Sequence, residues 1–308
     1  MEPQISRKRT VRDLQVNLAK YLIHLKEGQR LESIREIAAS TQMSIGAVST
    51  ALNGLQDVGA VAIQRRGHLG SIVEKLSVAK LWGVIEQGPL VIALSLPMHN
   101  RFEGLATGLK ISFEKAGIEA FLIFIRGSRT RLKALTANRC HAVLMSGLAA
   151  EKLCGKDYEM LFSLPPKSWV ADYNVFQRMD VDPGKPLRVA VDPDSFDHRY
   201  LTDLEFKGQD IDIHHVSFVH ISRLLKNGEI DAAVWTSDQN ESYLGEGITS
   251  RPLSQHVMEQ VGDKSVSAAF VGRKGSEAVR AILQTCINPD DVMKIQSEIV
   301  AGRMVPEY

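Results

Sequence analysis

From residue 90 onward, short apolar runs typical of buried strands alternate with amphipathic segments typical of helices. The series then repeats, because Ala142 and Leu144 fall 90 positions before Ala232 and Val234, each pair in a strand that follows a helix end and a turn. The expected strands cover 90–94, 120–125, 141–145, 187–191, 211–216 and 231–235, and the expected helices cover 101–116, 128–137, 147–153, 196–206 and 217–226. Such alternation builds parallel α/β sheets, and its repetition predicts two similar lobes.

The first 76 residues differ from the rest of the chain in charge. They carry a net charge of +4, whereas residues 77–308 carry −3, within a whole-chain charge of +1. This is the arrangement expected when a small module contacts a polyanion and a larger module does not. Because 308 residues exceed the roughly 100 to 200 of a single domain, we expect a module at 1–76, a linker at 77–89 and a larger domain at 90–308.

The basic module begins with two helix signals. Apolar residues recur at helical spacing between Val11 and Leu25, which predicts a first helix. Ser33 lies three residues before Glu36, which is the spacing of a capping box. A short second helix is therefore expected, ending near Ser40.

A third helix is expected after Ser44, a residue type that caps helices. Its inward apolar stripe consists of Val48, Ala51, Leu52 and Leu55. Strand-like runs at 61–66 and 71–74 then flank a glycine-containing tip at 67–70. Helix, short helix, turn, helix and hairpin in this order predict a winged helix-turn-helix, whose third helix enters the major groove of DNA while the wing lies on phosphates.

The stretch RLESIREIAASTQMSIGAVSTALNGLQDVGAVAIQRRGHLGSIV resembles the DNA-binding domain of GntR-family bacterial repressors along nearly its whole length. The resemblance implies DNA contacts by Arg35, Ser44, Ile45, Gly46, Ser49, Thr50, Arg65, Arg66, Gly67 and His68. The chain departs from the family at Ile45 and Ser49, where arginines are usual. Ile45 is expected to contact a thymine methyl group and Ser49 to accept either base type, which lowers sequence specificity. Such a module can also serve in packing or protein interaction, and the basic wing argues against that role.

The repeated lobes resemble the type 2 periplasmic-binding-protein fold, in which two lobes close on a small ligand. The segments LPMHNRFEGLATGLK, FIRGSRTRL, DAAVWTS and VPEY are similar to the YhfZ group of GntR-like regulators, which joins such a wing to such a lobe pair. The expected fold class is therefore α/β, with an N-terminal winged helix-turn-helix followed by a two-lobe type 2 periplasmic-binding-protein-like domain.

Polar residues near the carboxyl ends of the predicted strands are candidates for an effector cleft, because ligands bind there in open α/β sheets. They are Ser95, Arg101, Arg126, Gly127, Ser128, Ser146, Asp192, Asp194 and Thr236. Arg126, with the backbone N–H groups of Gly127 and Ser128 at a helix N-terminus, suits a carboxylate or a phosphate. A structural role is the alternative, with Arg126 paired to a nearby acid and Ser128 as a helix cap.

The sequence contains no P-loop, no G-x-G-x-x-G after a strand and no H-E-x-x-H, and its three cysteines have no C-x-x-C spacing. Cys140 and His141 are strand neighbours that point to opposite faces, so they do not form a nucleophile and base pair. His214 and His215 have no convincing further ligands at metal spacing. We therefore expect no enzyme activity, no catalytic or metal-binding residues and no cofactor.

No apolar run approaches the roughly 18 residues of a membrane span, and residues 1–15 lack the apolar region of a secretory signal, so a cytoplasmic location is expected. The expected function is a bacterial transcriptional regulator that binds double-stranded DNA as a homodimer and responds to a small, anionic effector between its lobes. A LysR-type regulator has a similar sensor but a long linker helix, whereas Gly83, Gly88 and Pro89 are expected to interrupt the connector here. A cytoplasmic enzyme on a two-lobe binding fold is the alternative from another class.

Overall fold

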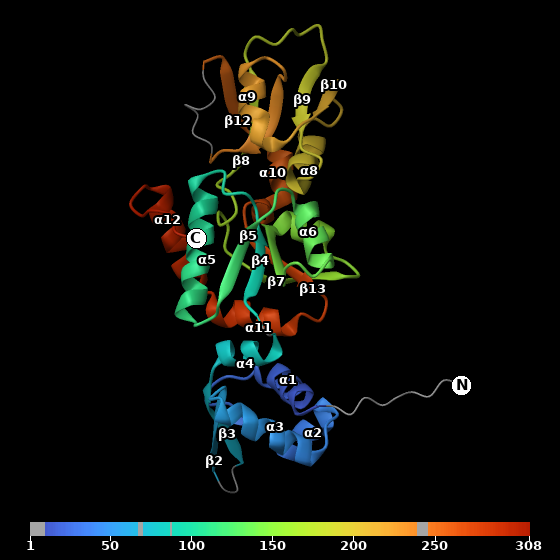
Figure 1. Cartoon of the computed structure of the whole chain (residues 1–308). Coiled ribbons are helices and arrows are strands. Elements are labelled where there is room, and N and C mark those ends of the chain that lie inside the picture. Colours follow the sequence, from blue (N-terminus) through green and yellow to red (C-terminus); the bar gives the residue numbers. More distant parts are fainter. Residues whose placement is uncertain (1–9, 67–69, 87, 239–245) are drawn as a thin grey trace, which may run out of the picture. The chain divides into compact units, whose positions relative to one another are not determined.

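The computed structural model describes residues 10–66, 70–86, 88–238 and 246–308 (Figure 1). The chain divides into two compact units, which we describe separately. The first contains the described residues up to Pro89 together with 114–119 and 277–286, and the second contains the remainder. The first unit therefore includes two short segments from later in the chain.

Three helices and a small sheet form the N-terminal part of the first unit. They are α1 (Val11–Leu22), β1 (Arg30–Leu31), α2 (Ile34–Thr41), α3 (Ile45–Asp57), β2 (Val61–Arg65) and β3 (Ser71–Leu76). The capping box of Ser33 and Glu36 starts α2, and the Ser44 hydroxyl caps α3 by accepting a hydrogen bond from Ala47 N. The predicted stripe of α3 is buried, and the strand order is β1-β3-β2. The predicted winged helix-turn-helix is therefore confirmed in its element order.

The segment expected to be an interrupted connector contains a helix, α4 (Val78–Ile85). Gly83 lies inside this helix, so the expectation that Gly83 breaks the connector is wrong. The helix forms despite its glycine because Ser77 caps its first turn and because Leu81 and Trp82 are buried, which stabilises it through packing. Within the first unit, α4 packs against both α1 and α11 (Glu277–Cys286).

The second unit contains two lobes, each built on a five-stranded sheet. The first sheet has the order β5-β4-β6-β13-β7, and its strands are β4 (Leu90–Leu94), β5 (Ala120–Phe124), β6 (Ala142–Ser146), β7 (Tyr158–Ser163) and β13 (Ala268–Arg273). β4, β5 and β6 run parallel, whereas β13 pairs antiparallel with both β6 and β7. The helices of this lobe include α5 (Asn100–Lys115), α6 (Ser128–Thr136), α7 (Gly147–Leu153) and α12 (Pro289–Val300).

The second lobe repeats this topology. Its order is β10-β9-β11-β8-β12, and its strands are β8 (Tyr173–Arg178), β9 (Leu187–Val191), β10 (Ile211–His215), β11 (Ala232–Thr236) and β12 (Ile248–Pro252). β8 takes the antiparallel position that β13 holds in the first lobe. Its helices include α8 (Phe196–Glu205), α9 (Ile221–Lys226) and α10 (Gln255–Val261). The chain crosses between the lobes twice, between β7 and β8 and between α10 and β13.

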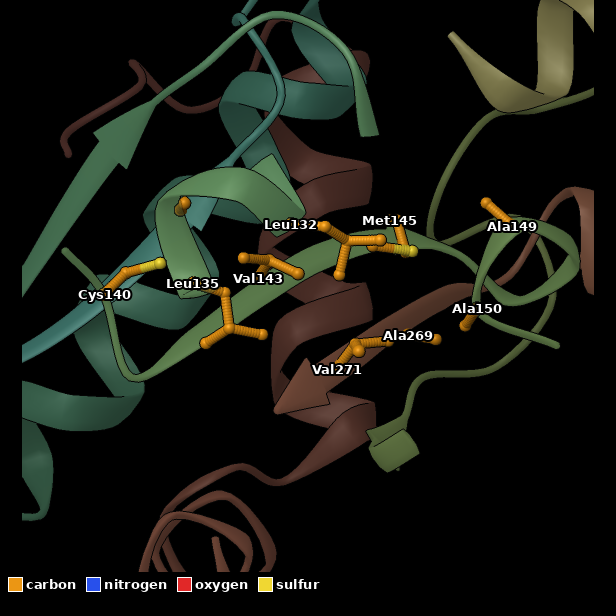
Figure 2. Packing of buried hydrophobic residues seen from close by; sticks show 10 residues of the cluster. Leu132, Leu135, Cys140, Val143, Met145, Ala149, Ala150, Ala269 and Val271 are labelled. Atoms are coloured by element: carbon orange, nitrogen blue, oxygen red, sulfur yellow. The ribbon is translucent and has the colours of Figure 1, made fainter. Parts of the chain in front are cut away.

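The core of the first lobe fixes the end of β6, where one candidate residue lies. Val143 and Met145 of β6 pack with Leu132 and Leu135 of α6 and with Ala269 and Val271 of β13 (Figure 2). Cys140 belongs to this cluster, and burial raises the pKa of its thiol to about 11, which makes it unreactive. Ser146 is the last residue of β6, all five residues of which are buried.

Candidate functional site

Several residues predicted to contact DNA line one hollow on the winged helix. Arg35 of α2, Ile45 and Ser49 of α3, and Arg65 of β2 lie around it together with Gly70. Ile45 is 53% exposed although it is a large apolar residue. An exposed isoleucine at the start of a reading helix is available for contact with a thymine methyl group.

The other predicted DNA-contacting residues do not line this hollow, and two of them lie outside the described residues. Gly46 and Thr50 are exposed on α3, and the exposed Ser44 is occupied as its cap. Arg66 is exposed, and its Nε donates to Gln64 Oε1 at 3.0 Å. Gly67 and His68 lie outside the described residues.

Arg126 lies where the first lobe meets the second. Its Nη1 donates to both carboxylate oxygens of Asp192, at 2.9 and 2.7 Å, and its Nη2 donates to Asp194 Oδ2 at 2.5 Å. Asp192 is fully buried and also accepts hydrogen bonds from Asp194 N and Phe218 N. The three predicted charges thus pair with one another, which is the arrangement of the structural alternative.

Gly127 and Ser128 extend the same contact between the lobes. Gly127 has φ +81, and a Cβ on it would lie 2.7 Å from the Asp194 carbonyl oxygen, so only glycine fits without a shift. The Ser128 hydroxyl accepts a hydrogen bond from Phe196 N at 3.2 Å. This cluster of Arg126, Asp192, Asp194, Gly127 and Ser128 is called the lobe bridge below.

Arg101 makes a second ion pair between the lobes. Its Nε donates to Asp238 Oδ1 at 2.7 Å, and both side chains are largely buried. The other carboxylate oxygen of Asp238 accepts from Ala171 N and from the hydroxyl of Thr236. Arg101 therefore has a fixed acidic partner, as Arg126 does.

A pocket in the second unit collects side chains from both lobes, and we call it the interlobe pocket. Two predicted residues, Ser95 and Thr236, line it. The remaining lining residues are Met98, His99, Phe102, Trp169, Val170, Tyr173, Ser195, Asp197, His198, Phe218 and Trp235. The lining is thus mainly aromatic and contains one carboxylate.

Asp197 is the buried acid of this pocket. It lies in the first turn of α8, and its Oδ1 accepts a hydrogen bond of 2.6 Å from the hydroxyl of Ser146. Burial raises the pKa of Asp197 to about 6, although the Ser146 hydrogen bond and the positive charge of Arg131 act in the opposite direction. Ser146, a predicted effector residue, thus holds a pocket residue in place.

His99 brings an unpaired polar ring to the pocket. It stacks on Phe102 with ring centroids 4.2 Å apart, and Phe102 in turn meets Trp169 edge to face. Both ring nitrogens of His99 are buried, and neither has a hydrogen-bond partner among the described residues. Burial lowers the pKa of His99 to about 4, so the ring is neutral at pH 7.

Sequence reasoning missed most of the aromatic lining. Trp169 and Val170 come from the crossing after β7, which has no periodic pattern, and Tyr173 is the first residue of β8. His99, just before α5, and Asp197, in α8, follow strands that were predicted, so a wider search of the residues after each strand end would have found them.

Neither a metal centre nor a membrane span is found in the described part of the chain. No group of three or more His, Cys, Asp and Glu side chains there could hold a metal ion. Among the described helices, none has the length and apolar character needed to cross a bilayer.

These features define a class of protein in which a helix-turn-helix domain is joined to a two-lobe, periplasmic-binding-protein-like domain, and the predicted fold class is confirmed. The pattern of the YhfZ C-terminal domain matches residues 77–308, and that of a helix-turn-helix domain matches 26–73. The chain belongs to the YhfZ family, as the resemblance predicted. Assignment of the winged helix to the GntR family stays a prediction.

Two YhfZ proteins match this chain over most of their own length. The Escherichia coli (strain K12) protein YhfZ is 27% identical over 292 residues, which cover 94% of this chain and 95% of that protein. The crystal structure of YhfZ from Shigella flexneri has a TM-score of 0.58 and 25% identity, covering 71% of this chain and 93% of that one. The ligand-binding component of an ABC-type import system from Staphylococcus aureus has a TM-score of 0.49 at 12% identity, covering 71% of this chain and 80% of that one.

Proposed function

We propose that the protein is a transcriptional regulator that binds double-stranded DNA through its winged helix and a small-molecule effector between its lobes. The observation that carries the proposal is the convergence of Arg35, Ile45, Ser49 and Arg65 on one exposed hollow beside the wing. Arginines around such a hollow suit DNA phosphates, and the reading helix suits base edges. Binding to DNA places the working protein in the cytoplasm.

Each chain has one winged helix, which is too small to select a single DNA site by itself. We therefore propose a homodimer that binds an inverted repeat. Sedimentation as a monomer both alone and on DNA would exclude the dimer. The eight-residue α4 favours the YhfZ arrangement over a LysR-type regulator, which has a long linker helix.

The interlobe pocket is our proposed effector site, because it is concave, lined by both lobes and rich in aromatic side chains. The expectation that Arg126, Gly127 and Ser128 bind an anion stays a prediction. An anion there would have to replace Asp192 and Asp194, which already satisfy the guanidinium. Wild type and Arg126→Ala, titrated with carboxylates and sugar phosphates by calorimetry, test that expectation.

A connection from effector to DNA affinity is available through α4. This helix packs against α1 of the winged helix and against α11, which comes from the C-terminal part of the chain. An effector that binds one arrangement of the lobes better than another shifts the population, and typical couplings change affinity about 5- to 150-fold.

Fluorescence anisotropy on duplex DNA tests the DNA-binding proposal. Arg65→Ala should weaken binding on all sequences and should flatten the slope of log affinity against log salt by about one. Arg199→Ala, which removes an arginine that is 58% exposed in the second unit, is the matched control and should change neither quantity. Ile45→Ala should instead change sequence preference among duplexes selected from a random pool. Equal affinity and slope for wild type and Arg65→Ala would contradict the docking arrangement.

A further inference from the structure

The interlobe pocket contains a carboxylate without a charged partner in hydrogen-bond contact. Asp197 is 6% exposed, and its Oδ1 is occupied by Ser146. Among the described residues, none donates a hydrogen bond to Asp197 Oδ2 or forms an ion pair with this side chain. The pocket lining described above contains no lysine and no arginine. A buried carboxylate in such a position is costly unless a partner arrives.

Arg131 supplies a positive charge that acts on Asp197, but among the described residues no ion pair or hydrogen bond joins the two side chains. It is buried on α6, its Nη1 donates to the Ile125 carbonyl oxygen at 2.8 Å, and its guanidinium lies 5.9 Å from the centre of the Trp169 ring. Its charge lowers the pKa of Asp197, but burial raises that pKa by more. Asp197 is therefore incompletely balanced within the protein.

The rest of the lining suits the apolar body and the charge of an organic cation. Phe102, Trp169, Tyr173, Phe218 and Trp235 surround the pocket with aromatic rings, whose faces carry negative electrostatic potential. Each of these rings attracts a cation and none of them repels an apolar chain. His99, neutral at pH 7, adds a hydrogen-bonding ring beside them.

We propose that the interlobe pocket binds a small primary amine, with its ammonium group on Asp197 Oδ2 and its apolar body among the aromatic rings. The inference rests on the proposed function, since it names the chemical class of the effector. It differs from the anion expected at the lobe bridge, because Asp197 would repel a carboxylate or a phosphate in the pocket.

Calorimetry with the full-length protein tests the charge preference directly. The probes are butylamine, 2-phenylethylamine and tryptamine, each compared with the alcohol and the carboxylate on the same carbon skeleton. At least one amine should bind about tenfold or more tightly than its alcohol, and its carboxylate should bind more weakly still. Equal binding of amine and alcohol, tighter binding of a carboxylate, or no binding by any amine would overturn the proposal.

Two variants localise the site. Asp197→Asn should weaken the best amine at least about tenfold while leaving the alcohol unchanged, because it removes the charge and keeps the shape. Phe218→Leu should weaken the amine about two- to tenfold through loss of one ring face. Asp203→Asn is the matched control, since this carboxylate lies on the same helix α8, is 62% exposed and does not line the pocket. Unchanged amine affinity in Asp197→Asn would place the amine elsewhere and reject the proposal.

Failure of this inference is distinguishable from failure of the proposed function. Salt-dependent DNA binding without any amine preference would support the proposed regulator function and would reject the proposed amine effector. Amine binding without salt-dependent DNA binding would keep the pocket assignment and reject the regulator. An amine that shifts DNA affinity would support both.

Discussion

The lobe bridge and the interlobe pocket both join the two lobes, yet they treat charge in opposite ways. In the bridge, Arg126 meets Asp192 and Asp194, and every charge has a partner from the protein. In the pocket, Asp197 has a hydroxyl partner on one oxygen only, and both nitrogens of His99 have no hydrogen-bond partner among the described residues. The bridge is complete without a ligand, whereas the pocket is not.

This difference distinguishes residues that hold the lobes together from residues that can recognise a ligand. Matched charges stabilise a contact between the lobes and offer little to a ligand, which would first have to displace them. Unmatched polar groups reduce stability and gain most when a ligand supplies the missing partner. Substitutions in the bridge should therefore reduce stability, whereas removing charge from the pocket should increase it.

Loss of Asp192 should produce the largest effect. Asp192→Ala leaves Arg126 Nη1 and two backbone N–H groups without their acceptor, while Nη2 keeps Asp194, so we expect a destabilisation of about 3 kcal/mol. Urea denaturation of the full-length protein at pH 7.5 measures it. If Asp192→Ala unfolded at the same urea concentration as wild type, the bridge would not hold the lobes together, and the contrast with the pocket would fail.

The repeated strands and helices of each lobe were predictable from the sequence, because apolar runs and helical spacing are local signals. The parallel strands, among them β4, β6, β9 and β11, follow from apolar runs between helices. The antiparallel strands β8 and β13 were not predicted, because each follows a crossing between the lobes and takes its place from pairing with residues far along the chain. Such long-range pairing leaves no short-range periodicity to read.

The candidate site was predictable in the same uneven way. Arg126, Asp192 and Asp194 were found as residues after strand ends, but their mutual pairing depends on how one lobe faces the other. Trp169 and Val170 reach the pocket from a crossing segment, where no rule about strand ends applies. In α4, propensity at Gly83 suggested a break, and tertiary burial of Leu81 and Trp82 overrode it.

Asp197→Asn should stabilise the protein at neutral pH. The pKa of Asp197 is raised to about 6 in the folded state, so the ionised side chain disfavours folding above that pH. We expect a gain on the order of 2 kcal/mol at pH 7.5 that falls below about 1 kcal/mol at pH 4, where the carboxyl is protonated in the folded state and about half protonated in the unfolded state. Urea midpoints at the two pH values measure it. A loss of stability at pH 7.5 would mean that the protein itself balances this carboxylate.

His99→Phe should reduce the acid sensitivity of the protein. Burial lowers the pKa of His99 to about 4, so the neutral ring contributes stability that is present above pH 6.5 and is lost as the pH falls toward 4. Phenylalanine keeps the stack on Phe102 and does not titrate, so the loss between pH 6.5 and 4.5 should shrink by about 1 to 2 kcal/mol. Thermal unfolding across this range measures it. An unchanged pH dependence would show that the ring gains a partner or solvent in solution.

Asp194→Ala should have the smallest effect, although Asp194 makes the shortest contact with Arg126, at 2.5 Å. Its side chain is 41% exposed, whereas that of Asp192 is fully buried, and solvent screens an exposed pair. We expect a loss of about 1 kcal/mol or less, reduced further in 1 M salt, where the Debye length is about 3 Å. A loss equal to that of Asp192→Ala would mean that distance rather than burial sets the strength of the bridge. The double variant Asp192→Ala/Asp194→Ala sharpens the test. In the Asp192→Ala background Asp194 is the remaining acidic partner of Arg126, so Asp194→Ala should cost more stability there than it does in wild type.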